Sequence, residues 1–326
     1  MRRARKVLIA LMGVALAAPV AQAQFGGWLN KGVQKAKKVQ EANAPWTPEQ
    51  EKAIGEASAA KMISVFGLYD NPAMVNYVNL VGNTAARQAS RDVPYHFAIL
   101  DTEIINAFAL PGGYIFITRG ALANMKNEAE LAGTLAHEVA HVDGRHLEKQ
   151  IRAKKNKQLA SETVFEEVGS RLPTPSELTA IAKDIVTEAL STSYSPQSES
   201  EADKKGTEFA AYAGYRATGL RDFLQMLAKA DDARRLGLWG KTHPPLPKRV
   251  ATLTEVAAPF GDAGQTLEER FQQNASFAPP PAPKPAAEAA PPPAPKPAAK
   301  PAAKPAHKPA AKPAAKPAAK SGGSGQ

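Results

Sequence analysis

The stretch from Glu128 to His146, EAELAGTLAHEVAHVDGRH, constrains the fold and chemistry of this chain more than any other. It contains a His-Glu-x-x-His motif at residues 137–141. Because residues four apart share one face of a helix, His137 and His141 would present two imidazoles one turn apart. This spacing suits the chelation of zinc, with Glu138 beside the ion as a general base for a water molecule. The stretch therefore predicts a helix that carries a metal site.

The apolar residues of the same stretch support the helix. At 100° per residue, four of them fall within an arc about 80° wide; they are Leu131, Leu135, Val139 and Val142. The two histidines lie off that arc, so we expect one side of the helix to pack and the other to carry chemistry. Gly144 is the expected helix stop. His146 then lies beyond the helix, and we do not expect it to be a ligand.

A third ligand is expected between residues 198 and 203. Glu199 and Asp203 are four apart and would share a face of a second helix. A site with two histidines often takes such a glutamate as its third ligand, and a carboxylate one turn further on can orient a ligand histidine. Glu201 would point about 200° away from Glu199 and is the competing candidate. The alternative is a solvated acidic helix start that binds no metal.

The N-terminus has the pattern of an export signal. Four cations within residues 2–6 precede an uncharged run from Val7 to Ala18, and Ala21-Gln22-Ala23 fits a cleavage site. We expect residues 1–23 to be a cleaved signal peptide and the product to be periplasmic, with an uncleaved anchor as the alternative. No later apolar run reaches the roughly 18 residues of a membrane helix, so no transmembrane segment is expected after cleavage.

Composition restricts both the chemistry and the partners. The sequence has no cysteine, which excludes disulfides, thiol catalysis and thiolate zinc ligands. The formal net charge of +10 comes from the cations near the N-terminus and from the lysines after residue 283. The rest of the chain is close to neutral, so we expect no nucleic-acid binding.

The C-terminal part repeats Lys-Pro-Ala-Ala between Lys296 and Ala319. Such a segment has little to bury and is expected to be disordered and extended. We predict a disordered tail at residues 263–326, which could hold the chain to an anionic envelope surface. Residues 24–44 are expected to form an N-terminal arm, and residues 45–262 the folded domain.

The folded domain is predicted to be α+β and mainly helical, with a small β-sheet next to the motif helix. Thr47-Pro48-Glu49 and Asn71-Pro72 have the pattern of helix starts. Residues 95–100 and 114–118 are rich in aromatic and β-branched residues and are predicted strands. Residues 106–113, between them, end in a Pro-Gly-Gly turn. The edge of this sheet could pair with an extended peptide, or the segment could be an ordinary hairpin.

These motifs together resemble the HtpX/BepA/CAAX-prenyl-protease family of zinc metallopeptidases, and soluble periplasmic BepA-like members most. The resemblance extends from about Ala53 to Thr254. Its motifs, in the family's order, are Asn-Ala-Phe-Ala-Leu-Pro-Gly-Gly at 106–113, the His-Glu-x-x-His motif, Arg-His at 145–146 and Glu-x-Glu-Ala-Asp at 199–203. The resemblance implies a gluzincin-like domain with one zinc ion on His137, His141 and Glu199. It also implies that Glu138 is catalytic and that Asp203 supports a ligand.

His243 is the second candidate catalytic residue. From sequence alone, a single histidine in a loop is more often a surface residue. However, Thr242-His243-Pro244-Pro245 matches the family's His-Pro segment. The resemblance implies that His243 can approach the zinc, where it would either block the ion or stabilise the oxyanion. The chain departs from the family at Pro196, where an arginine is usual, so any role of that arginine is not carried over.

The resemblance implies a zinc-dependent endopeptidase that acts on protein or peptide substrates. These would be misfolded or unassembled envelope proteins, hydrolysed by a zinc-activated water with Glu138 as general base. The alternative is a periplasmic chaperone-like binding protein with a capped zinc site and little proteolysis. The transmembrane helices and tetratricopeptide repeats of other family members are not seen in this sequence, so their modes of partner recognition are not carried over.

Overall fold

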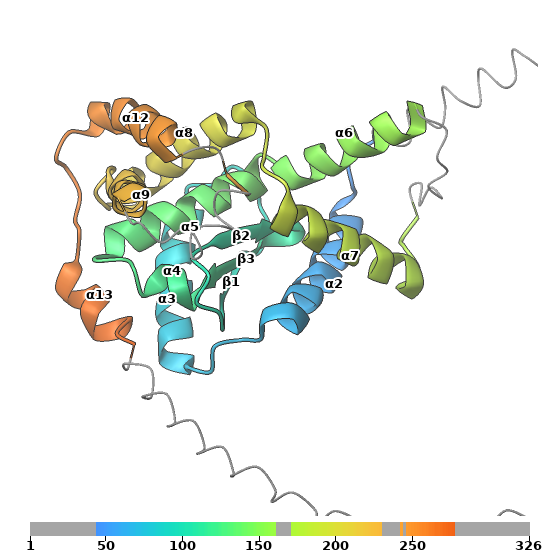
Figure 1. The fold of residues 1–326 in the computed structure, drawn as a ribbon, viewed down its shortest axis with the longest axis horizontal. Coiled ribbons are helices and arrows are strands. Elements are labelled where there is room, and N and C mark those ends of the chain that lie inside the picture. Colours follow the sequence, from blue (N-terminus) through green and yellow to red (C-terminus); the bar gives the residue numbers. More distant parts are fainter. Residues whose placement is uncertain (1–43, 161–170, 230–241, 244–245, 278–326) are drawn as a thin grey trace, which may run out of the picture. The chain divides into compact units, whose positions relative to one another are not determined.

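The structure is a computed structural model that describes residues 44–160, 171–229, 242–243 and 246–277. The predicted signal peptide, the arm up to residue 43 and the Lys-Pro-Ala repeats lie outside these residues. The described part is mainly helical with one small sheet, which confirms the predicted fold class (Figure 1). Its helices are α2 (Pro48–Phe66), α3 (Pro72–Ala86), α4 (Arg119–Leu122), α5 (Glu128–Asp143), α6 (His146–Ala160), α7 (Pro175–Ser191), α8 (Pro196–Tyr212), α9 (Gly219–Lys229), α12 (Leu246–Ala257) and α13 (Glu268–Asn274).

The predicted helix starts are confirmed, with side chains that satisfy the first backbone N–H groups. Thr47 accepts a hydrogen bond from the backbone of Gln50, whose side chain accepts one in return, and Pro48 occupies the first turn of α2. Asn71 caps α3 in a similar way by accepting from the backbone N–H of Met74. Local sequence therefore sets where these helices begin.

The sheet has three strands in the order β1-β3-β2. β1 (His96–Leu100) and β3 (Tyr114–Thr118) confirm the two predicted strands and run parallel. β2 (Ala107–Leu110), which was not predicted as a strand, pairs antiparallel with β3 through the turn at Pro111–Gly113. β2 is thus one arm of a hairpin and also an edge strand of the sheet, and the pairing of this edge with a peptide stays a prediction.

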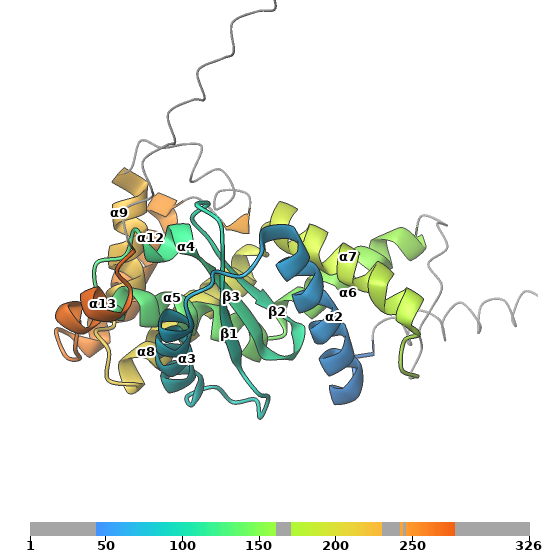
Figure 2. The same cartoon turned by 90° about the horizontal axis from the view of Figure 1, so that it is seen from below.

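Successive strand residues point to opposite faces of the sheet. Both faces are buried because each packs into its own hydrophobic core. Ile99, Ile115 and Ile117 belong to a core shared with α3, α5, α8 and α9. Phe108 and Phe116 belong to a second core with α2 and α7. Figures 1 and 2 show α2, α6 and α7 beyond β2, at the end of the sheet away from α9, α12 and α13. The motif helix α5 lies over β2 in the first core.

Helix α5 is buried along its whole circumference. Every residue from Glu128 to Asp143 is buried, and the helix contacts α3, α8, α9 and the sheet. The apolar side packs into the core as expected, and the side that carries the histidines is also covered, by α8. The predicted stop is confirmed, since α5 ends at Asp143 and Gly144 is its C-cap.

The folded domain extends beyond the predicted boundary at residue 262. Helix α13 packs onto the first core through Phe271 and Ala275, which are 2% and 5% exposed. Arg270 binds the buried carboxylate of Glu128, which also accepts hydrogen bonds from two tyrosine hydroxyls. The boundary was placed too early because residues 263–277 contain few apolar side chains. Two of these, Phe271 and Ala275, are nevertheless buried in the core.

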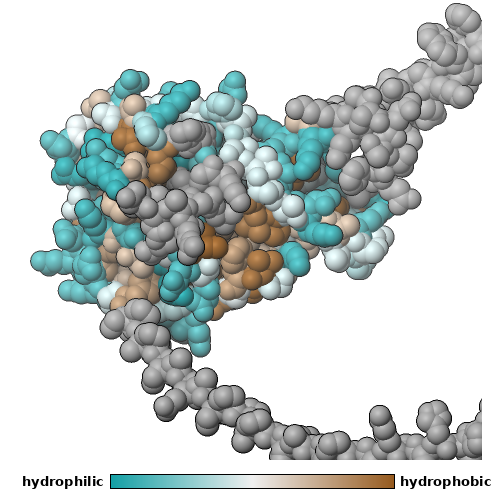
Figure 3. Space-filling view, in the orientation of Figure 1, coloured by the Kyte–Doolittle hydropathy of each residue, from teal (hydrophilic) through white to brown (hydrophobic). Residues whose placement is uncertain are grey.

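The outer surface of the described residues is mixed. In the view of Figure 1, hydrophilic side chains surround several smaller hydrophobic patches (Figure 3). A few large apolar residues are exposed, and they come from separate segments. Single exposed apolar residues of this kind are common on folded proteins; here they are Val65, Leu68, Leu80, Leu172 and Tyr212. Among the helices of the described part, none is long and apolar enough to cross a membrane.

Candidate metal centre

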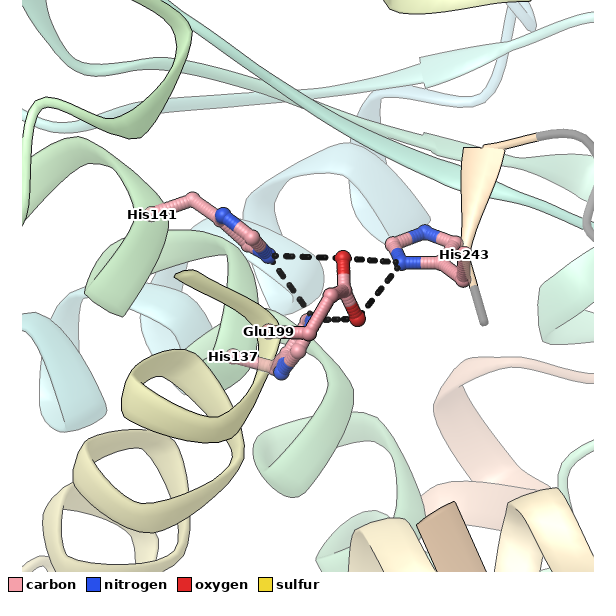
Figure 4. Close-up of side chains that lie close together, drawn as sticks. All are labelled: His137, His141, Glu199 and His243. Carbon is pink, nitrogen blue, oxygen red and sulfur yellow. Dashed lines mark hydrogen bonds and ion pairs between the residues drawn. The ribbon is translucent and has the colours of Figure 1, made fainter. Parts of the chain in front are cut away.

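Three elements bring four candidate ligands together. His137 and His141 come from α5, Glu199 comes from α8, and His243 precedes α12 (Figure 4). One ligand atom from each lies within 4.8 Å of all the others. All four side chains are buried. Side chains separated by more than 100 positions in the sequence thus converge in a single interior cluster.

The spacing of the ligand atoms suits a single ion. The Nε2 atoms of His137 and His141 are 3.0 Å apart. The carboxylate of Glu199 places Oε1 3.6 Å from His141 Nε2 and Oε2 3.9 Å from His137 Nε2. Ligands about 2.0–2.1 Å from one tetrahedral zinc ion lie about 3.3 Å from each other. The two histidines and Glu199 therefore fit one zinc ion.

The other ring nitrogens of the two histidines point away from the cluster. His137 Nδ1 lies 3.1 Å from Asp203 Oδ1, and His141 Nδ1 lies 2.9 Å from His146 Nδ1. If each Nδ1 carries a proton toward its partner, both Nε2 lone pairs converge on the cluster. Two converging lone pairs repel unless a cation lies between them. This donor set is therefore suited to a metal ion.

Asp203 is held beside His137 by Arg249, a residue of α12. The Arg249 guanidinium donates from Nη2 at 2.5 Å and from Nε at 3.1 Å to the two oxygens of Asp203. Its Nη1 also lies 3.5 Å from Glu199 Oε2. Burial alone would raise the pKa of Asp203, but Arg249 and His137 outweigh burial and lower it. Asp203 therefore stays ionised as an acceptor, and Arg249 is a contributor to the site that the sequence analysis did not identify.

Glu138, the neighbour of His137 in the chain, has a buried side-chain oxygen without a hydrogen-bond partner among the described residues. The side chain is 1% exposed, and its Oε1 has no hydrogen-bond partner among the described residues. Burial raises the pKa of Glu138, and the nearby histidines His137 and His243 offset this only in part. A carboxylate with a free oxygen and a raised pKa is suited to exchange protons with a water molecule in the site.

His243 lies inside the cluster and not at the surface. Its Nδ1 is 3.0 Å from Oε1 and 3.3 Å from Oε2 of Glu199. The preceding Thr242 accepts a hydrogen bond at 3.3 Å from the side chain of Asn106, at the start of β2. This position agrees with the resemblance and excludes the surface alternative. Both roles implied by the resemblance need this position, and the choice between them stays a prediction.

The structure places Glu199 at the cluster and Glu201 outside it. The Glu201 side chain is 42% exposed, and its Oε2 lies 3.4 Å from His146 Nε2. His146, which the sequence set aside as a ligand, instead contacts a ligand histidine. Tyr194 was also missed, and its ring stacks on His141 with centroids 4.1 Å apart. Tyr194 and His141 line a recess with Ala109, Leu110 and Pro111, so the sheet edge adjoins the site.

Gly206 allows α8 to approach α5 closely enough for these contacts. A Cβ at this position would lie 2.7 Å from the Cα and 2.8 Å from the N of His137. These are backbone atoms, which cannot rotate away. The distance between the two helices, and hence the position of Glu199, depends on this glycine. Sequence reasoning missed it because the contact joins two distant segments.

A buried cluster of two histidines and a glutamate, with a second glutamate beside it, is consistent with a metallopeptidase of the gluzincin type. Comparison with known proteins gives the same class. The sequence model of the protein family described as "Peptidase family M48" matches residues 73–257, which is more than half of the chain. The chain belongs to peptidase family M48.

Several curated proteins are similar to the chain. The beta-barrel assembly-enhancing protease of Yersinia pestis is 31% identical over 199 residues, which cover 57% of this chain and 39% of that protein. The mitochondrial metalloendopeptidase OMA1 of Arabidopsis thaliana is 30% identical over 172 residues, 52% of this chain and 33% of that protein. The metalloprotease YcaL of Escherichia coli K12 is 28% identical over 158 residues, 48% of this chain and 60% of that protein. The chain thus spans between about a third and 60% of the length of these relatives.

Proposed function

We propose that the chain is a zinc-dependent endopeptidase that hydrolyses misfolded or unassembled envelope proteins. His137, His141 and Glu199 are the proposed zinc ligands, and Glu138 is the proposed general base. The observation that carries the proposal is the unpartnered, buried Oε1 of Glu138 beside the ligand cluster. A purely structural zinc site has no need for such a group.

The residues around the cluster support hydrolysis. A zinc ion held there would polarise the scissile carbonyl and acidify water. Glu138 would accept a proton from that water and return it to the leaving amine, and its raised pKa favours the return step. Asp203 accepts from His137 and keeps the Nε2 lone pair of that ring directed at the cluster. Arg249 keeps Asp203 ionised throughout.

An extended substrate suits the edge of the sheet. Thr118 N–H donates to the carbonyl of Asn106, so Asn106 and, by antiparallel alternation, Phe108 face β3. The backbone groups of Ala107 and Ala109 then face away from β3. A peptide that adds to this edge would run past the recess that contains His141. Such binding favours unfolded chains, because most strands of a folded substrate are already paired on both sides.

The proposed location is the periplasm. It rests on the predicted signal peptide at residues 1–23, which lies outside the described residues. The curated relatives include proteins named beta-barrel assembly-enhancing proteases, a name that fits work in the cell envelope. The Lys-Pro-Ala tail, with its repeated cations, is proposed to contact an anionic envelope surface.

The position of His243 favours a second candidate function. His243 contacts Glu199 inside the cluster, where a substrate carbonyl or water would otherwise approach. A site capped in this way could bind zinc and unfolded chains without cleaving them. In that case the chain would be a chaperone-like binding protein with little proteolysis. The two candidates differ in turnover and not in zinc content.

The test compares hydrolysis and zinc content of the full-length protein and its Glu138→Gln variant. Casein hydrolysis should be abolished by chelation and should fall by about 10²- to 10⁴-fold in Glu138→Gln. Zinc content should be unchanged in that variant, because Glu138 is not a ligand. Glu56→Gln, an exposed position on α2, is the matched control and should behave like wild type. Undiminished hydrolysis by Glu138→Gln would sink the proposal.

Two further outcomes separate the candidates and identify substrates. Zinc binding without hydrolysis, in both wild type and His243→Ala, would favour the binding protein. If hydrolysis is found, the Glu138→Gln protein should retain its substrates, and cross-linking in envelope extracts would capture them. Capture of proteins from outside the envelope alone would contradict the proposed substrate class.

A further inference from the structure

The mechanism above makes no use of His146, although this residue is 2% exposed and touches a proposed ligand. Its Nδ1 lies 2.9 Å from Nδ1 of His141, and the two rings are nearly perpendicular at 83°. Tyr194 stacks on His141 with the rings 22° from parallel. His141 is therefore held at its ring face by Tyr194 and at Nδ1 by His146.

The backbone adopts an uncommon conformation to place His146 there. In a continuous helix, His146 would lie about 140° around the axis from His141. Instead α5 ends, and Arg145 adopts a φ of 51°, a left-handed conformation that is unfavourable for a residue with a side chain. A Cβ at Gly144 would come within 2.3 Å of His146 Nε2, so the ring occupies space that only a glycine leaves open. A turn of this kind persists where surrounding contacts stabilise it.

The contact between His141 and His146 links the proton positions of the two rings. With a metal ion on His141 Nε2, as proposed above, the lone pair of this ring is on Nε2 and its proton is on Nδ1. That proton is donated to Nδ1 of His146, which therefore has no proton there and carries its own on Nε2. His146 Nε2 lies 3.4 Å from Glu201 Oε2, long for a hydrogen bond but close enough for attraction. These two contacts connect Glu201 to His146 and His146 to His141.

We propose that His146 is a positioning residue that sets the tautomer and the ring orientation of His141 for the metal, with Glu201 supporting His146. This inference rests on the zinc site of the proposed function. The two ligand histidines are then supported in different ways. His137 donates to Asp203, a carboxylate held by Arg249, whereas His141 donates to a neutral imidazole. Both supporting carboxylates lie on α8, so this helix orients both ligands.

The first test measures zinc affinity of the full-length protein by competition with a chromophoric chelator. His146→Leu removes the acceptor and should lower the affinity about 10- to 100-fold, as is typical when the partner of a ligand histidine is lost. His146→Asn can place an amide oxygen close to the former Nδ1 and should recover most of the affinity. A purely space-filling role would not produce this difference. Equal affinity of the leucine variant and wild type, or equal losses in both variants, would overturn the proposal.

Glu201 is tested in the same assay with a matched control on α8. Glu201→Ala should weaken zinc binding by a smaller factor than His146→Leu, because it acts one step further from the metal. Lys204→Ala, an exposed neighbour on the same helix, should have no effect. If wild type itself binds no zinc, the proposed function fails. If wild type binds zinc and all these variants bind it equally, only the role of His146 fails.

A second measurement needs no variant and so does not depend on how the substitutions fold. In the zinc-loaded wild-type protein labelled with ¹⁵N-histidine, NMR should show His141 protonated at Nδ1 and His146 protonated at Nε2. The opposite tautomer of His146 would contradict the hydrogen bond on which the proposal rests. The expected pair of tautomers would support it even if His146→Leu fails to fold.

Discussion

Gly206→Ala tests whether the close approach of α8 and α5 sets the geometry of the metal centre. The new Cβ would lie 2.7 Å from the Cα of His137, and contacts below 3.0 Å are essentially never found for real Cβ atoms. The obstacle is backbone on a helix that is buried on all sides, so α8 must move away by several tenths of an ångström. The strain should cost about 1–3 kcal/mol of folding stability. Alanine is otherwise the better helix former, which offsets up to about 1 kcal/mol of this cost.

The larger effect is expected at the site, although the new Cβ contacts only the backbone of His137 and none of the ligand atoms. Glu199 and Asp203 move with α8, whereas His137 and His141 stay with α5. We expect zinc affinity to fall about 10- to 100-fold, and hydrolysis to fall further, because misplacement by about 1 Å can cost 10²-fold in rate. Chelator competition and casein turnover measure the two effects, and Ser200→Ala at an exposed position of α8 is the control. A Gly206→Ala protein with wild-type zinc affinity and turnover would refute the idea that this helix contact sets the site.

Three further predictions concern the side chains around the cluster. His243→Ala should keep its zinc and should raise casein turnover if His243 blocks the ion, or lower it if His243 stabilises the oxyanion; unchanged turnover would contradict both roles. Arg249→Leu leaves the buried Asp203 carboxylate without its partner and should cost about 3–5 kcal/mol in urea unfolding. Asp203 contributes stability that is present above its unfolded pKa of about 3.9 and is lost as the pH falls further, because its folded pKa is lower. The unfolding temperature of the chelator-treated protein should therefore drop between about pH 5 and pH 3 in wild type, and less in Asp203→Asn.

Features with a local physical cause could be predicted from the sequence. Thr47 and Pro48 cap a helix with residues three positions away, and the strands at 96–100 and 114–118 follow from side-chain type. The grouping of His137, His141 and Glu199 needed only helix periodicity and the usual composition of zinc sites. The roles of these residues as ligands remain predictions until a metal is measured.

The parts that were missed depend on contacts between distant segments. β2 has only four residues, and a Pro-Gly-Gly turn follows it, so its turn signal dominated its strand signal. Helix α13 adds few apolar residues to the core and is held by the ion pair between Arg270 and Glu128, 142 positions apart. His146 was set aside as a ligand because it lies beyond the end of the motif helix. Its actual position requires the left-handed Arg145, which is uncommon for a non-glycine residue.

The face of α8 that meets α5 shows how much a pattern could have revealed. Glu199, Asp203 and Gly206 stand at positions i, i+4 and i+7, so they share one stripe of the helix. An apolar stripe at this spacing would indicate ordinary packing, but this stripe carries two carboxylates that are both buried. Buried carboxylates need cations, and Arg249 accounts fully for only one of them, Asp203. The remaining carboxylate, Glu199, faces two imidazole nitrogens across a distance that suits a divalent ion. The buried charge of Glu199, which also contacts His243, thus agrees with the metal site that the His-Glu-x-x-His motif predicts.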